Sequence, residues 1–431
     1  MLTAEENDLL CLVEGDAPMG QIFRRHWLPA CLTEEVAEPD GTPLRVRLLG
    51  EKLVAFRDSD GRVGLVGEFC PHRQASLALG RNEECGLRCL YHGWKIDVDG
   101  NVLEMASEPP ESRFVEKVKH KAYPTREAAG FVWTYMGPSE EMPEFQPPAF
   151  QPTPDTKISI VKIHIPCNWA QILEGAIDSA HSSSLHSSDM VPARVDSAKA
   201  TGHNWLRPST DKAPKLEVEE TGFGFRYAAL RRPIQNAATH HYVRMTVFIA
   251  PYTVVIPPNN LYKIAILHVP SDNTNTAFHF IAFGGPTVPD QESWRKFCGA
   301  QVGIDVDAQF RKIRTYDNNY LQDRNAMKLG SFTGIRGIPN QDIAMWETMG
   351  PIADRSKDRL GASDLAIVEF RRIMVAAARR VQAGGAAIGT TEPRTPHILL
   401  QGYEGIVPKT TDWRTLGGMQ GEKETNAEQR V

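Results

Sequence analysis

Alternating apolar and polar positions divide the first part of the chain into short elements. Residues 8–31 have the spacing of a helical segment that ends near Pro29. From Leu44 onward, short apolar runs follow one another and are separated by turn residues such as Asp60-Gly61. These runs predict a small antiparallel β domain, with strands at 44–48, 53–56, 63–66 and 131–135.

A proline-rich stretch interrupts this pattern. Residues 143–154 contain five prolines and few apolar positions, which is typical of a semi-rigid linker. We therefore expect two domains, 1–150 and 151–431.

The residues after the linker show both helical and strand periodicity. Strands are predicted at 242–249, 262–269 and 277–283. Helices are predicted at 168–186, 292–314 and 363–382. Ser363 is the expected N-cap of the last helix, and Gly384-Gly385 the expected stop. An antiparallel sheet covered by helices on one side is the α+β class. The polar residues from Asp412 onward predict a tail whose end is mobile.

Composition and charge exclude several classes of protein. Of the 431 residues, 41% are hydrophobic and 23% charged, as in an ordinary globular protein. A net charge of −5 argues against nucleic acid or an anionic membrane as the main partner. The acidic start of the chain lacks the basic region of a secretory signal, and no apolar run is long enough to cross a bilayer. Scattered cysteines favour reduced thiols, so we expect a cytoplasmic protein.

Two short stretches carry paired metal-ligand residues, Cys70-Pro71-His72 and Cys89-Leu90-Tyr91-His92. Each supplies one thiolate and one imidazole, whereas a zinc finger usually groups its cysteines in one knuckle. Mixed half-sites suit a two-iron cluster in which one iron takes both sulfurs and the other takes both ring nitrogens. The predicted cluster ligands are therefore Cys70, His72, Cys89 and His92. A structural zinc site with unusual ligand order is the alternative.

Asp178, His181 and His186 form a second candidate metal site. Asp178 and His181 share a helix face, but His186 lies about 140° round an ideal helix from His181. Both imidazoles reach one ion only if the helix breaks between them, and the serines at 182–184 favour such a break. Two histidines and a carboxylate are typical of a non-haem Fe(II) site that binds O2. A merely exposed histidine pair is the alternative.

Together these motifs resemble the Rieske non-haem iron ring-hydroxylating oxygenases. The match runs C-x-H, sixteen residues, C-x-x-H-G-W, and then Asn168-Trp169, Glu174, Asp178-x-x-His181 and His186. It extends from the first residues to about residue 380. The resemblance implies an all-β Rieske domain, a helix-grip (START-like) catalytic domain, a [2Fe-2S] cluster and a mononuclear Fe(2+).

The resemblance also implies roles for two carboxylates. In the family an Asp on a late helix completes the iron site, and Asp342 matches that position best, with Asp354 and Asp358 as alternates. Asp178 is expected to link His181 to His92 of a neighbouring subunit. Because the two sites then come from different chains, a homo-oligomer built on trimers is implied.

The resemblance is greatest to members that use phthalate. It implies addition of both atoms of O2 at the 4,5-position to give a cis-dihydrodiol, with monooxygenation of a vanillate-like or aryl-sulfonate-like acid as the alternative. Paired carboxylates are held well by arginine forks. Arg244 lies in an otherwise apolar strand and is the first choice; Arg207 and the hydroxyl of Ser179 follow. The other arginines considered are Arg194, Arg226, Arg231 and Arg232.

The source of electrons is expected to be another protein. The chain has no flavin or nicotinamide fingerprint. In this family the electrons come from an iron-sulfur flavoprotein reductase that draws on NADH. A Rieske electron carrier with an inert second domain is the rival hypothesis, and the Asp178/His181/His186 group argues against it.

Overall fold

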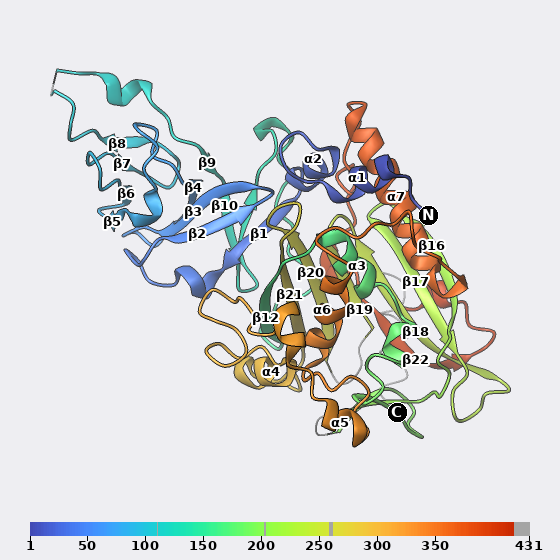
Figure 1. Ribbon diagram of the computed structural model, residues 1–431. Coiled ribbons are helices and arrows are strands. Elements are labelled where there is room, and N and C mark those ends of the chain that lie inside the picture. Colours follow the sequence, from blue (N-terminus) through green and yellow to red (C-terminus); the bar gives the residue numbers. More distant parts are fainter. Residues whose placement is uncertain (110, 202–203, 258–261, 418–431) are drawn as a thin grey trace. The chain divides into compact units, whose positions relative to one another are not determined.

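The computed structural model describes residues 1–109, 111–201, 204–257 and 262–417 (Figure 1). The chain divides into two units, one formed by Val13–Phe145 and a larger one formed by Met1–Leu12 with Gln146–Val431. Helix α1 (Ala4–Cys11) contacts α7 (Leu365–Gln382) and belongs to the larger unit. Most of the tail expected to be mobile lies outside the described residues.

Three small antiparallel sheets make up the smaller unit. Their strand orders are β1-β11-β10, β2-β3-β4-β9 and β5-β6-β7-β8. The first sheet consists of β1 (Trp27–Leu32), β10 (Thr125–Ala128) and β11 (Phe131–Tyr135). The second consists of β2 (Leu44–Leu48), β3 (Glu51–Arg57), β4 (Val63–Gly67) and β9 (Ala122–Tyr123). The third consists of β5 (Arg81–Glu83), β6 (Gly86–Arg88), β7 (Lys95–Ile96) and β8 (Val102–Glu104).

The predicted β domain is confirmed, but the helix predicted over 8–31 is only partly right. Two short helices occupy this region, α1 and α2 (Pro18–Arg24), and Trp27–Leu32 is strand β1. β1 pairs with β11, with Trp27 opposite Tyr135. The partner strand supplies the hydrogen bonds that make this segment extended, and it lies far along the chain where local periodicity cannot detect it.

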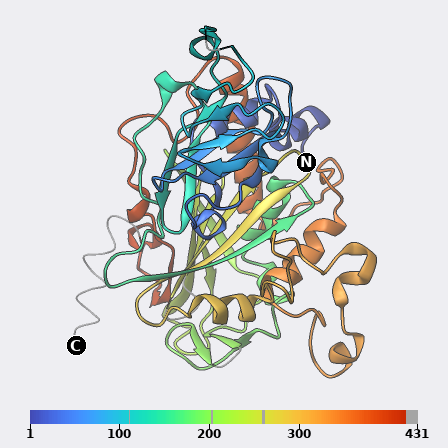
Figure 2. The ribbon, with the colours of Figure 1, turned by 90° about the vertical axis from the view of Figure 1, so that its left-hand side faces the viewer.

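The larger unit is built on one 8-stranded antiparallel sheet. Its order is β12-β21-β20-β19-β18-β17-β16, and β22 pairs with β18. These strands are β12 (Lys157–Ile165), β16 (Lys215–Thr221), β17 (Gly224–Arg231), β18 (His240–Ile249), β19 (Thr253–Ile256), β20 (Lys263–Pro270), β21 (Thr276–Gly284) and β22 (Tyr403–Pro408). Helices α3 (Trp169–Ala176) and α6 (Ile338–Thr348) lie on one side of it (Figures 1 and 2). Helix α3 contacts β19 and β20, and α7 contacts β16 and β17. The antiparallel sheet is thus covered by helices, so the predicted α+β class is confirmed.

The predicted helices of this unit are shorter in the structure. The helix expected over 168–186 is α3, which begins after its N-cap Asn168 and ends at Ala176. The helix expected over 292–314 is α4 (Gln291–Cys298), which ends where Gly299 adopts a left-handed conformation with φ of 63°. The N-cap of α7 is Asp364 rather than Ser363.

A small sheet and several short helices complete the described part of the chain. In the small sheet, β15 (Asn204–Arg207) pairs with β13 (Met190–Pro192) and β14 (Lys199–Thr201). The remaining α-helix is α5 (Arg324–Lys328), and 3-10 turns lie at Thr33–Val36, Leu77–Leu79, Phe114–Lys117, Ser139–Glu141, His181–Ser183, Tyr316–Leu321, Ala362–Asp364, His397–Leu399 and Trp413–Thr415. None of the described helices has the length and apolarity that crossing a membrane requires.

Candidate metal centres and substrate cavity

Two equivalent turns hold the four predicted cluster ligands. In one, Gln74 N–H donates to the carbonyl of Cys70 at 3.0 Å; in the other, Gly93 N–H donates to that of Cys89 at 3.0 Å. Gln74 and Gly93 both have positive φ, 60° and 74°. This left-handed residue closes each turn tightly, so that the cysteine and the histidine of one half-site come from the same short loop.

The side chains in these turns fit an iron-sulfur cluster. The thiols of Cys70 and Cys89 are buried and form no disulfide. The rings of His72 and His92 lie 4.4 Å apart between centroids, and the indole of Trp94 stacks on His72. Nδ1 of His72 is buried without a hydrogen-bond partner in the described part of the chain, as expected of an atom that binds a metal.

The chemistry of the thiols supports the same conclusion. Burial, together with the neighbouring Cys89, raises the pKa of Cys70 to about 11. Such a thiol stays protonated at neutral pH unless a cation stabilises the thiolate. Bound iron supplies that positive charge, and two sulfurs with two imidazoles match the ligand set of a Rieske centre.

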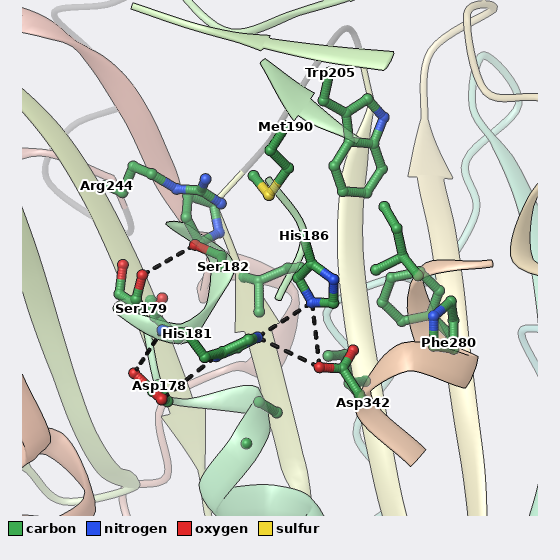
Figure 3. A pocket seen from close by; sticks show the side chains of 18 of the residues that line it. Asp178, Ser179, His181, Ser182, His186, Met190, Trp205, Arg244, Phe280 and Asp342 are labelled. Atoms are coloured by element: carbon green, nitrogen blue, oxygen red, sulfur yellow. Dashed lines mark hydrogen bonds and ion pairs between the residues drawn. The ribbon is translucent and has the colours of Figure 1, made fainter. Parts of the chain in front are cut away.

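His181, His186 and Asp342 converge on one point in the larger unit (Figure 3). Nε2 of His181 lies 3.2 Å from Nε2 of His186 and 3.4 Å from Oδ1 of Asp342. Nε2 of His186 lies 3.2 Å from the same carboxylate oxygen. Two imidazoles and one carboxylate brought this close form a donor set for a non-haem iron with positions left open. We call these three residues the triad.

The local backbone explains how two histidines five residues apart can meet. Helix α3 ends at Ala176, and the chain then forms a 3-10 turn at His181–Ser183. The expected break in the helix is therefore present. Asp342 reaches the same point from α6, whereas the alternates lie elsewhere: Asp354 is exposed, and Asp358 forms an ion pair with Arg371.

Asp178 orients the first of the two triad histidines. Its Oδ2 lies 3.5 Å from Nδ1 of His181, and its Oδ1 accepts the N–H of Ala180 at 2.7 Å. Burial raises the pKa of Asp178, but hydrogen bonds from His181 and the backbone outweigh burial, so the pKa lies below its ordinary value. An ionised Asp178 thus faces Nδ1 of His181 and leaves Nε2 directed at the triad.

Gln341 orients the second histidine, and the sequence analysis missed it. Nδ1 of His186 donates to Oε1 of Gln341 at 2.8 Å. Nε2 of Gln341 in turn donates to Oδ2 of Asp189 and to the carbonyl of Ile335, both at 3.0 Å. These bonds fix the tautomer of His186 with its free Nε2 in the triad. The one signal in the sequence is that Gln341 directly precedes Asp342.

Buried ion pairs hold helix α3 beside the site. Glu174, near the end of α3, accepts from Arg355 and from Arg371, each at 2.8 Å. Arg371 belongs to α7, so this carboxylate joins the two helices. Removing one partner of such a buried pair lowers the free energy of unfolding by about 3–5 kcal/mol. The pairs therefore fix the position of the C-terminal end of α3.

A cavity opens beside the triad, and most of its wall is apolar (Figure 3). Its polar lining consists of Asp178, Ser179, Ser182, Tyr227, Arg244 and Thr246 together with the triad. Its apolar lining includes Ala176, Met190, Trp205, Ile256, Pro257, Ile266, Phe278, Phe280, Ile338 and Trp346. An apolar cavity with a few polar groups beside a metal site suits an aromatic ring that carries polar substituents.

The predicted substrate residues occupy different positions around this cavity. Arg244 is 7% exposed and lines the wall, and its guanidinium makes no hydrogen bond within the described residues. Ser179 also lines the cavity. Arg207 lies behind the wall, where it donates to Oγ of Ser182 at 2.9 Å and to Oγ of Ser183 at 3.0 Å. Arg244 therefore presents a guanidinium without a hydrogen-bond partner among the described residues to the cavity, whereas Arg207 is bonded to the serine turn.

Two family models match the chain. The model described as Rieske [2Fe-2S] domain matches residues 26–123, and the model described as LigXa C-terminal domain like matches residues 134–430. The smaller unit therefore carries the cluster turns within a Rieske domain, and the second model spans most of the larger unit.

Individual proteins match over nearly the whole chain. The phthalate 4,5-dioxygenase oxygenase subunit of Pseudomonas putida is 66% identical, covering 96% of this chain and 94% of that protein. The 3-chlorobenzoate-3,4-dioxygenase oxygenase subunit of Comamonas testosteroni is 34% identical, covering 96% and 97%. The terminal oxygenase of carbazole 1,9a-dioxygenase from Novosphingobium sp. KA1 has a similar fold, with a TM-score of 0.58, 21% identity and coverage of 87% and 96%. This chain therefore belongs to the Rieske ring-hydroxylating oxygenases, and its cofactors are a Rieske [2Fe-2S] cluster and a mononuclear iron.

Proposed function

We propose that this chain is the terminal oxygenase that adds both atoms of O2 to the 4,5-position of phthalate and forms a cis-dihydrodiol. One observation carries the proposal: the buried guanidinium of Arg244 faces an apolar cavity beside the triad without a hydrogen-bond partner among the described residues. A buried unpaired cation costs free energy that a bound carboxylate offsets. The relative at 66% identity carries the same activity in its name.

The cavity walls suggest how the substrate is held. Arg244 binds one carboxylate of the substrate, and the hydroxyl of Ser179 donates to the carboxylates from the adjacent wall. The aromatic ring packs against apolar side chains such as Phe278 and Phe280. Arg207 holds the hydroxyl of Ser182 in position and need not touch the substrate.

The chain's residues hold the two metal centres in the following way. Cys70, His72, Cys89 and His92 hold the cluster, and the triad holds the mononuclear iron. When bound, these groups deliver electrons and activate O2. Asp178 orients His181 and also accepts a hydrogen bond from the partner subunit's His92, which gives electrons a short bonded route between chains. This bridge requires a homo-oligomer, and a trimer is the simplest closed form.

The electrons come from a separate protein. As an oxygenase subunit the chain works in a multicomponent system, and we propose an NADH-linked iron-sulfur flavoprotein as the reductase. The absence of a flavin or nicotinamide fingerprint in the chain supports this assignment.

The test is substrate-dependent consumption of NADH and O2 by the oxygenase with a reductase, across a panel of aromatic acids. Phthalate should give the highest kcat/KM, and with labelled O2 both labelled atoms should enter one product molecule. A product with one labelled atom, or a clear preference for a monocarboxylate or an aryl ether, would contradict the proposal. Three irons per chain should accompany activity, because the cluster holds two and the triad one.

A further inference from the structure

Three arginines are buried together beside the cavity: Arg207 on β15, Arg231 on β17 and Arg244 on β18. We call them the arginine cluster. Burial, and then the charges of Arg244 and Arg231, lower the pKa of Arg207 to about 9. Burial, and then Arg244, lower the pKa of Arg231 to about 10. The three cations thus repel one another, and the ligand-free protein needs a counter-charge.

The carboxylate of Glu404 is placed to supply that counter-charge. Strand β22 pairs with β18, and Glu404 lies directly opposite Arg244. The oxygens of Glu404 accept the N–H of Ala198, at 3.0 Å; burial raises its pKa and the Tyr242 hydroxyl lowers it, but within the described residues Glu404 forms no ion pair. The nearby Asp211 is already paired with Arg232, at 2.7 Å. Glu404 therefore acts on the arginine cluster through its charge alone.

We propose that Glu404 is a specificity-determining residue that sets the charge of the arginine cluster at two units and so tunes how strongly the cavity prefers aromatic dianions over monoanions. Three guanidiniums and one carboxylate leave two positive charges, which match two substrate carboxylates. Asp178 and Asp342 also line the cavity, and their two charges would balance that of a bound Fe(II), so they leave this match unchanged. The proposal rests on the function proposed above.

Charge matching predicts a definite ratio of effects. Coulomb energy is proportional to the product of the charges, so changing the arginine cluster by one unit shifts log Kd twice as far for a dianion as for a monoanion. Glu404→Gln adds one positive unit and should tighten phthalate about tenfold and benzoate about threefold. Arg231→Gln removes one unit and should weaken phthalate about tenfold and benzoate about threefold. Arg231 does not itself line the cavity but donates to Oγ and to the carbonyl of Ser179, at 3.3 and 2.8 Å, and the amide of glutamine keeps one donor for that contact.

The experiment measures Kd for phthalate and for benzoate by calorimetry on the anaerobic holoenzyme at about pH 8. Burial raises the pKa of Glu404 to about 7, so the carboxylate is ionised there. The decisive variant is the double substitution Arg231→Gln with Glu404→Gln, which returns the charge to two units and should restore the wild-type ratio of the two constants. Glu220→Gln, on the exposed part of β16, is the matched control and should change neither constant.

The outcomes separate this inference from the function on which it rests. If the wild-type holoenzyme binds phthalate no better than benzoate, the proposed function is wrong. If it prefers phthalate but Glu404→Gln weakens both acids, or shifts both equally, Glu404 has a structural role and the inference is overturned. Failure of the double variant to restore the ratio also overturns it, whereas restoration supports it, since a purely structural role would not be reversed by a second charge change.

Discussion

The cluster turns and the catalytic cavity are built in opposite ways. All four cluster ligands lie between residues 70 and 92, in two turns that close on their own backbone hydrogen bonds. The triad joins a 3-10 turn at 181–183 and its continuation to His186 with helix α6, and the cavity adds strands β15, β18 and β21. Electron handling is thus a local property of the chain, whereas substrate choice is a property of the tertiary structure.

The largest effects should come from removing one metal centre at a time. His72→Ala should abolish the visible absorption of the cluster and leave the mononuclear iron, because the two donor sets share no residue. Asp342→Ala should do the reverse. Turnover should vanish in both, and iron analysis with absorption spectra distinguishes them. Asp354→Ala, at an exposed alternate carboxylate, should retain full activity; loss of the mononuclear iron in that variant would contradict the assignment of Asp342.

Asp178→Asn should nearly abolish turnover and leave both centres loaded. The amide replaces a charged acceptor with a group that accepts more weakly, so the orientation of His181 and the route between subunits are lost. Iron content and the reduced-cluster spectrum should match the wild type, while single-turnover oxidation of the cluster slows. Activity within a factor of a few of the wild type would rule out the bridging role.

Arg244→Met should lower kcat/KM for phthalate by about 10- to 100-fold, the effect of one lost charge-assisted hydrogen bond. Benzoate, with one carboxylate fewer, should lose less. Arg226→Met is a useful comparison, because that arginine pairs with Glu219 and is absent from the cavity wall. An equal loss for both acids would point to a folding defect instead of a substrate contact.

The smallest effect should come from Gln341→Leu, which removes the acceptor for Nδ1 of His186 and keeps the triad itself. We expect iron to bind about tenfold more weakly, as is typical when a partner of a metal ligand is lost. The readout is retention of mononuclear iron during dialysis against a chelator. Gln341→Glu preserves an acceptor and should retain more iron than the leucine variant.

Sequence patterns predicted elements well where the forces are local. The strands of the β domain and the run at 242–249 were correct because each is a short, largely apolar run, which is a local signal. The strand at Trp27–Leu32 and the loops after Cys298 were missed, because a partner strand and a left-handed Gly299 decide them. The local pattern of apolar residues reveals neither the partner strand nor the backbone conformation of Gly299.

The sequence by itself determined the chemistry of this protein: mixed Cys-His half-sites, a broken helix with two histidines, and hence an iron-dependent oxygenase. These features depend on the types of residues that lie close together in the sequence, so they can be recognised without the structure. Only the tertiary structure brought Asp342 and Gln341 to His186, placed Arg244 in the wall and Arg207 behind it, and put Glu404 opposite Arg244. Such contacts join residues far apart in the chain, and they form only when packing of the sheet and helices offsets the entropy of bringing them together.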